Sequence, residues 1–285
     1  MDTRFWGPSG WALLHLIAAT PIEPKRQHNV KEWFDLLEYA LPCKYCRASF
    51  HDYTEIQPLT DKILESPDTF GHWLYEIHNR VNAKLRGQGL LTAPDPSWAS
   101  IKAKYADQTK KLCDSTPLVG WDFMTSVAFS TPTHPYKSVP MPDTPDVTTH
   151  LTLAERNRYN LLTRKERLAK LRRWWSLIPS ILPCSAWRIQ WATAVKHAGS
   201  IASVLDRSQE TVMRRMWQIE KQVCAGLRCQ LPHPSLPVLK QEVSAFESKC
   251  GSLKKGLTCR TRKNKQRRVA MTQRVRRLRK QAGLV

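Results

Sequence analysis

The chain has 285 residues and a formal net charge of +21, with 45 Lys and Arg against 24 Asp and Glu. Hydrophobic residues make up 41% of it, which is enough apolar surface for a core and excludes a wholly disordered chain. No apolar run approaches the roughly 20 residues that cross a bilayer. Its eight Cys are too scattered for a small secreted disulfide scaffold.

The positive charge lies almost entirely in the second half. Residues 1–120 carry 14 basic and 14 acidic residues, whereas residues 121–285 carry 31 and 10. Such a basic excess indicates a polyanionic partner, most often nucleic acid, and solubility alone is the alternative. The apolar run at 11–19 is short, contains His15 and follows a single basic residue, so we expect no cleaved signal peptide.

Apolar residues at helical spacing, without strand-like alternation, predict an all-α fold. In the first 115 residues they mark helices near 10–20, 30–41, 67–85 and 95–112, which together predict an all-α bundle of four to five helices. Residues 116–150 hold six Pro and many Ser and Thr, which predicts an extended connector. Helical patterns return over 151–248, the second, basic domain. We find no internal repeat.

The tail at 249–285 has 14 basic residues and no acidic one, so self-repulsion should keep it open unless it binds an anion. Within the basic domain, residues 200–223 fit a helix-turn-helix, with Ala202 in the first helix, Asp206 in the turn and Val212 in the second helix. An ordinary helical hairpin packed on Trp187, Trp191 and Trp217 is the alternative. The candidate nucleic-acid contacts are Arg214, Arg215, Arg267, Arg268, Arg276 and Arg277.

Cys43 and Cys46 form a CxxC directly after Pro42, at an expected helix start. Zinc, a structural staple and redox chemistry all use such a pair. Tetrahedral zinc needs four ligands, and His51 alone does not complete a site. A helix N-terminus stabilises a thiolate and lowers the pKa of a Cys, which favours redox chemistry.

Polar residues interrupt two otherwise apolar helices on either side of this pair. Trp11 and His15 lie one turn apart, as do His78 and Asn82. Taken singly, each is a core residue more often than a ligand. The order W-x3-H, P-C-x-x-C and W-L-x3-H-N-x-V-N-x2-L, however, resembles the Erv/ALR family of FAD-linked sulfhydryl oxidases, particularly the compact versions of large DNA viruses. The resemblance covers about residues 5–113.

The resemblance implies a four-helix bundle with a short extra helix that binds FAD, with the cysteine pair against the flavin. Cys46 would be the flavin-proximal thiol, and Cys43 the thiol that exchanges with substrate. The implied FAD-binding residues are Trp11, His15, His78, Asn79, Val81, Asn82, Lys84 and Tyr105. The chain departs from the family at "RGQGLL" after Leu85, and only Cys113 remains of a common second structural cysteine pair.

The resemblance also implies a reaction and partners. Protein dithiols, with thioredoxin-like proteins as candidates, would pass electrons through the cysteine pair and FAD to O2, giving H2O2. We expect a homodimer, without membrane attachment, in the virion or the host cytoplasm. A non-catalytic virion or DNA-binding protein with the same bundle, and a redox-sensing regulator, are the alternatives.

Family members often relay electrons through a second cysteine pair. The candidates are Cys250 with Cys259 and Cys224 with Cys229. Bystander thiols, structural disulfides and a zinc site that uses Cys224, Cys229 and His233 are the alternatives.

Overall fold

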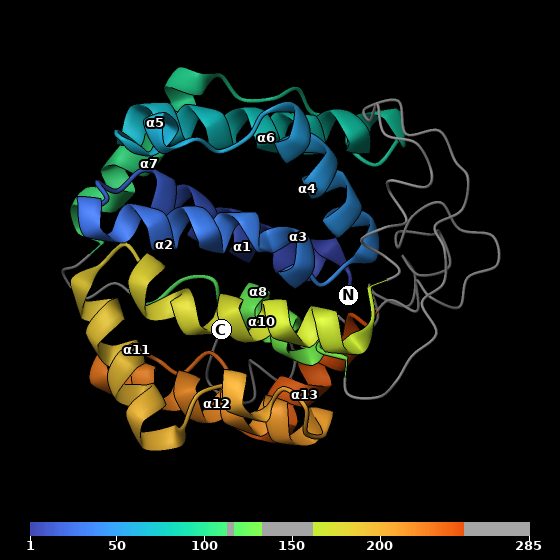
Figure 1. The fold of residues 1–285 in the computed structure, drawn as a ribbon, viewed down its shortest axis with the longest axis vertical. Helices are drawn as coiled ribbons and strands as arrows, with labels where there is room; N and C mark the ends of the chain where they lie inside the picture. The colour runs from blue at the N-terminus through green and yellow to red at the C-terminus, as the bar shows by residue number, and fades with distance from the viewer. Residues whose placement is uncertain (113–116, 133–161, 248–285) are drawn as a thin grey trace.

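The computed structural model describes residues 1–112, 117–132 and 162–247, and within these ranges all regular structure is helical (Figure 1). The predicted all-α class is therefore confirmed. The segment before the first gap contains α1 (Thr3–Ala18), α2 (Pro24–Asp35), α3 (Leu37–Ala40), α4 (Lys44–Ile56), α5 (Asp61–Leu64), α6 (Pro67–Gly87) and α7 (Trp98–Lys111). The later segments contain α8 (Trp121–Phe129), α10 (Arg164–Ile181), α11 (Ser185–Ala198), the 3-10 turn η1 (Ala202–Val204), α12 (Gln209–Gly226) and α13 (Leu236–Ala245).

Side-chain caps fix where several of the longer helices begin. The hydroxyl of Ser66 accepts from the amide of Thr69 at the start of α6, and Ser97, Ser208 and Ser235 cap α7, α12 and α13 in the same way. Each cap satisfies one backbone donor that the first helical turn leaves open, typically worth about 1 kcal/mol.

The helices are arranged in layers. In Figure 1, α1 to α3 lie beside α8 and α10, with α4 to α7 on one side of this central group and α11 to α13 on the other. The central contacts join α1 to α8 and α2 to α10. Trp33 of α2 stacks on Trp174 of α10 with ring centroids 5.0 Å apart, and both are fully buried. A single apolar core thus runs through the early and the late helices.

The prediction of an extended connector over 116–150 is wrong for residues 121–129, which form α8. Phe123, Met124 and Val127 of this helix have no exposed surface. Their burial against α1 outweighs the turn-forming composition of the surrounding segment. Residues 133–161 lie outside the described residues, and the division of the chain into domains stays a prediction.

The prediction of a helix-turn-helix at 200–223 is wrong, because its first helix does not form. α11 ends at Ala198, Gly199 turns the chain at φ +86°, and only the 3-10 turn η1 precedes the next helix. α11 packs directly against α12 with Trp187 and Trp191 buried, which is the helical hairpin of the alternative interpretation.

The residues predicted to read DNA make contacts within the chain. Arg214 pairs with Glu210 on its own helix at 3.0 Å, and Arg215 donates to the carbonyl of Ser200 at 3.3 Å. Whether they bind nucleic acid stays a prediction. The four tail arginines, as well as Cys113, Cys250 and Cys259, lie outside the described residues. None of the described helices combines the length and apolarity needed to cross a bilayer.

Candidate redox-active site

The cysteine pair lies at the start of α4, as the sequence predicts. Cys43 is the N-cap, in an extended conformation (φ −116°, ψ 128°), and Cys46 lies in the first turn. Nη1 of Arg47 donates to the carbonyl of Leu41 at 2.9 Å, and the amide of Arg47 donates to the carbonyl of Cys43 at 3.0 Å. Arg47, which the sequence analysis did not single out, therefore ties the Leu-Pro-Cys turn to the helix that carries the thiols.

The two thiols are electrostatically unequal. A hydrogen bond from the Cys46 thiol, with smaller contributions from the positively charged amino terminus, the Cys46 amide and Arg47, lowers the pKa of Cys43 to about 6, even though the residue is buried. The same hydrogen bond, together with burial, raises the pKa of Cys46. In the reduced pair the thiolate thus forms on Cys43 at neutral pH, which suits that residue for thiol–disulfide exchange.

Aromatic rings and imidazoles from three helices stack against one another beside α6. Trp11 of α1 lies parallel to His78 of α6 with centroids 3.8 Å apart, and His15 stacks on Tyr105 of α7 at 4.8 Å. His15 Nε2 and His78 Nδ1 are 3.1 Å apart, so one imidazole donates a hydrogen bond to the other. The structure therefore brings together residues from three segments that lie far apart in the sequence.

Both histidines are uncharged at neutral pH. Burial, with the nearby positive charge of Lys104, lowers the pKa of His15 to about 3 and that of His78 to about 4. Two adjacent imidazolium ions would repel each other, and a neutral pair can hold its mutual hydrogen bond.

The remaining predicted residues follow along α6. Asn82 donates to Asp95 Oδ1 at 2.7 Å, and Lys84 donates to the hydroxyl of Ser49 on α4. Asn79 and Val81 are half-buried on the same part of the helix. Because α6 rises about 1.5 Å per residue, the row from the stacked rings to Lys84 spans roughly 10 Å. It leads from the aromatic cluster toward the helix that carries the cysteines.

The segment after α6 folds back onto the site. Gly89 takes φ +64° in the "RGQGLL" stretch, and Arg86 pairs with Asp95 through both carboxylate oxygens. Asp95 therefore holds Asn82 and Arg86 together, a role that the sequence analysis missed. Its place directly before the Pro-Ser start of α7 was the available signal.

A small cavity of about 110 Å³ opens beside the stacked rings, between α1, α6 and α7. His15, Gly71, Trp98, Lys102 and Tyr105 are among its lining residues. A cavity of this size holds a few waters and is too small for a dinucleotide, so it is at most one end of a cofactor site.

The row of residues along α6 nevertheless fits FAD. The first half of α6 buries Phe70, Trp73, Leu74 and Ile77, whereas residues 78–86 are all only half-buried by the described chain. A helix that packs tightly at one end and presents Val81 and Leu85 incompletely covered at the other leaves an apolar face for a ligand. His78, the amides and Lys84 on this part of α6, with Trp11 of α1 stacked on His78, are suited to a planar ring system joined to phosphates.

The second cysteine pair in the described residues does not look like a mobile relay. Cys224 and Cys229 hydrogen-bond to each other at the end of α12, and burial raises the pKa of Cys224. The zinc alternative is also unsupported, because the described residues contain no cluster of metal ligands and His233 bonds to Glu220 at 2.7 Å. A shuttle role for Cys224 and Cys229 stays a prediction.

Fold and site together define a helical thiol–disulfide redox protein with a lateral face for a stacked planar cofactor. The Erv1 / Alr family model matches residues 8–104, the part of the chain that contains this site. No solved structure matches the chain significantly.

Three similar proteins carry the same activity in their names. "Probable FAD-linked sulfhydryl oxidase R368" of Acanthamoeba polyphaga mimivirus is 35% identical over 33% of this chain and 68% of its own length. "Putative FAD-linked sulfhydryl oxidase 347L" of Invertebrate iridescent virus 6 is 30% identical over 32% of this chain and 87% of its own. "Mitochondrial FAD-linked sulfhydryl oxidase ERV1" of Saccharomyces cerevisiae is 35% identical over 30% of this chain and 45% of its own. The chain belongs to the Erv1/Alr family of FAD-linked sulfhydryl oxidases.

Proposed function

We propose that this protein is an FAD-linked thiol oxidase that makes disulfides in protein substrates. The observation that carries the proposal is the cysteine pair at the start of α4, linked through Lys84 and Ser49 to the half-covered row on α6. That row would hold FAD, with Trp11, His15, His78 and Tyr105 supplying ring surfaces and Asn82 and Lys84 supplying polar contacts.

The chain's own chemistry is thiol–disulfide exchange. A substrate thiolate attacks the Cys43–Cys46 disulfide at Cys43, the S–S bond breaks, and Cys46 leaves as a thiol or thiolate. The second substrate thiol then attacks the mixed disulfide, so the substrate gains one S–S bond and the pair gains two electrons. Release of Cys43 is favoured because its lowered pKa makes it a good leaving group. Bound FAD supplies the route by which the two electrons of the pair reach O2, giving H2O2.

The purified protein should be yellow and should consume O2 when a dithiol is added. Cys46→Ala should reduce this activity to background, because the two-electron disulfide can no longer form. Cys184→Ala is the control, since Cys184, like Cys43, is a buried N-cap but has no second cysteine one turn on. A colourless protein that does not take up FAD would reject the proposal in favour of the non-catalytic alternative.

We also propose that the basic tail at 249–285 attaches the enzyme to a polyanion, with nucleic acid as the expected class. Its 14 basic residues without an acidic one support this. DNA binding should fall steeply between low and physiological salt, because each neutralised phosphate releases counterions. Deleting 249–285 should abolish that binding while dithiol oxidation stays unchanged, and low-salt binding that survives the deletion would contradict the assignment.

A further inference from the structure

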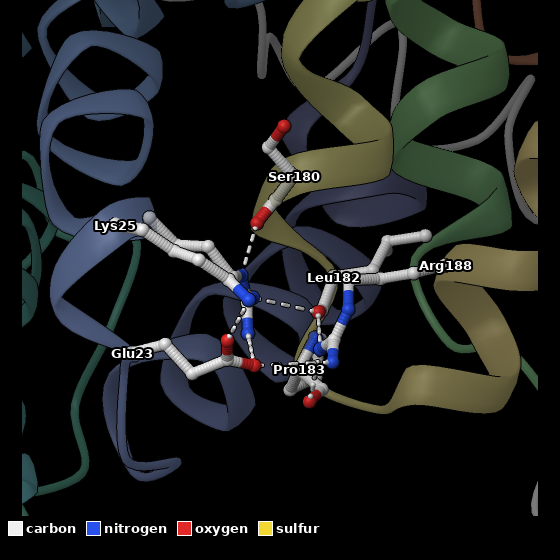
Figure 2. A network of polar contacts seen from close by, with 7 residues as sticks. Glu23, Lys25, Ser180, Leu182, Pro183 and Arg188 are labelled. Carbon is white, nitrogen blue, oxygen red and sulfur yellow. Dashed lines mark hydrogen bonds and ion pairs between the residues drawn. The ribbon is translucent and has the colours of Figure 1, made fainter.

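The turn that positions Cys43 occurs a second time in the chain. "LPCKYCR" at 41–47 and "LPCSAWR" at 182–188 share Leu, Pro, Cys and Arg at the same spacing. In the structure Cys184 is the N-cap of α11 as Cys43 is of α4. Arg188 Nη1 donates to the carbonyl of Leu182 at 2.9 Å (Figure 2). Arg47 Nη1 donates to the carbonyl of Leu41 in the same way, also at 2.9 Å. The same residues thus build the same helix start twice.

The helix that carries the flavin-facing row also has a counterpart. α6 follows Ser66 and α12 follows Ser208, and in both the serine caps a threonine three residues on, Thr69 or Thr211. The two hydroxyl pairs are 2.8 and 2.9 Å apart. In this register the buried positions agree: Phe70 with Val212, Leu74 with Met216, and Ile77 with Ile219.

The order of elements matches as well. In the first copy α2 and α3 lead into α4, and in the second α10 leads into α11. The last helix of each copy also packs alike, because α7 contacts α6 and α1, and α13 contacts α12 and α8. The starts of α7 and α13 are both Pro-Ser, at Ser97 and Ser235. α8 begins Gly-Trp at Gly120, as the middle of α1 reads Gly-Trp at Gly10. The expectation of no internal repeat is therefore wrong.

Equivalent residues of the two copies also contact each other reciprocally. Arg26 Nε donates to the carbonyl of Ser180 at 2.8 Å. Its counterpart Arg167 donates through Nε to the carbonyl of Tyr39, the counterpart of Ser180, at 3.2 Å. Figure 2 shows one of these two junctions, where Arg188 forms an ion pair with Glu23 beside Ser180 and Leu182. Reciprocal contacts of this kind are the signature of a two-fold interface.

The residues nearest the pseudo-axis pair with their own counterparts. Trp33 stacks on Trp174, and the preceding residues Glu32 and Arg173, 141 positions apart, form an ion pair. On α1 and α8, Phe123 lies against Gly10 while Leu13 lies against Gly120, which is again reciprocal. The two copies therefore face each other as the subunits of a symmetric dimer do.

The second copy has lost the residues of the redox site. Trp187 replaces Cys46, Thr125 replaces His15, and Cys224 replaces Asn82. Glu220 occupies the position of His78 and is fully buried in a hydrogen bond to His233. Residues 78–86 of α6 are half-buried in the first copy, whereas Glu220, Val223 and Cys224 at the corresponding part of α12 are buried by side chains of the chain itself.

We infer that residues 117–132 and 162–247 are a degenerate, flavin-free copy of the catalytic bundle, docked on it about an internal two-fold axis as a built-in partner. The chain then needs no second chain on the face formed by α1 and α2, because α8 and α10 cover it. This differs from the homodimer that the family resemblance implies. The claim that the second copy binds no flavin rests on the proposed function, whereas the claim that the two copies pair does not.

Native mass spectrometry and light scattering of the full chain test the pairing. We expect a monomer of 32.9 kDa at micromolar concentration. A stable dimer of twice that mass would overturn the built-in partner. This result does not depend on flavin, so a colourless protein would reject the oxidase proposal without affecting it.

Flavin counting tests the degenerate copy, by the ratio of flavin absorbance to protein mass. We expect one FAD per chain, and two would overturn the inference. Equivalent positions give a matched pair of variants. Asn82→Ala should weaken FAD binding about tenfold, the effect of one lost polar contact, whereas Cys224→Ala removes no such contact and should leave FAD binding within about twofold. FAD lost equally from both variants, with both folded by circular dichroism, would show that the second copy also binds the cofactor.

Discussion

The two cysteines of the pair acquire different pKa values mainly from the hydrogen bond between their thiols. Cys43 caps the helix and lies near Arg47, whereas Cys46 lies within the first turn and donates its proton toward Cys43. The sequence predicted a low-pKa thiolate at this helix start. It could not say which cysteine would carry it, because that depends on which sulfur accepts the hydrogen bond.

The reduced pair should therefore titrate in the weakly acidic range. Above a pH of about 6 the Cys43 thiolate forms, and below it the thiol returns. Thiolate absorbance near 240 nm, followed on dithiol-reduced protein with the Cys43→Ala curve subtracted, should show a midpoint near pH 6. A midpoint above 8, as in a free cysteine, would contradict the assigned asymmetry.

The two stacked histidines make the catalytic bundle sensitive to acid. Their folded-state pKa values, about 3 for His15 and about 4 for His78, lie below the value of 6.5 expected when unfolded. At a pH between the folded and the unfolded pKa values, the unfolded chain binds more protons than the folded chain. Stability should therefore be lost as the pH falls from about 6.5 toward 4.

Thermal unfolding at pH 7 and pH 4.5 measures this loss of stability. The drop in Tm between the two should be smaller in His15→Gln, which keeps a hydrogen-bonding side chain and cannot gain the proton. His28→Gln is the control, because His28 is exposed on α2 and should leave the drop unchanged. An equal drop in His15→Gln and the unmodified protein would assign the acid sensitivity to other groups.

At the scale of elements, helical periodicity predicted the long amphipathic helices well. α6 was expected from its Pro-Asp-Thr start and its apolar face, and both are present. The predictions failed where tertiary contacts decide the outcome. α8 lies in a segment whose Pro and Ser content predicts a connector, and η1 replaces a full helix because Gly199 turns the chain early.

Gly120 shows how tightly α8 is fitted to α1. Its φ of +98° is unfavourable for other residues, and an added Cβ would lie 2.7 Å from a methyl carbon of Leu13. Gly120→Ala should lower the free energy of unfolding by about 2–4 kcal/mol, combining left-handed strain with overpacking. Gly89→Ala, with φ +64° and open space around it, should cost only the strain of about 1–2 kcal/mol. Denaturant midpoints compare the two, and equal losses would mean that the α1–α8 contact tolerates an added methyl.

At the scale of the whole molecule, the sequence hides the duplication because the two copies differ where the recognisable motif lies. Positions that build helix starts and the shared interface agree, such as Arg26 with Arg167 and Trp33 with Trp174. Positions that serve the redox site differ, and these carry the recognisable motif. The motif on which the family resemblance rests is therefore present in the first copy and absent from the second.

A shared core also predicts that the two copies unfold together. Trp174 belongs to the second copy but stacks on Trp33 of the first, so Trp174→Ala should cost about 3–5 kcal/mol and destabilise both. Flavin release, which reports on the first copy, and far-ultraviolet circular dichroism, which reports on all helices, should shift to lower temperature by the same amount and remain coincident. Ile189→Ala is the control, since Ile189 is 60% exposed on α11 of the second copy and should shift neither signal. If Trp174→Ala instead splits the transition, with flavin retained while part of the helical signal is lost, the copies are independent folding units that only touch.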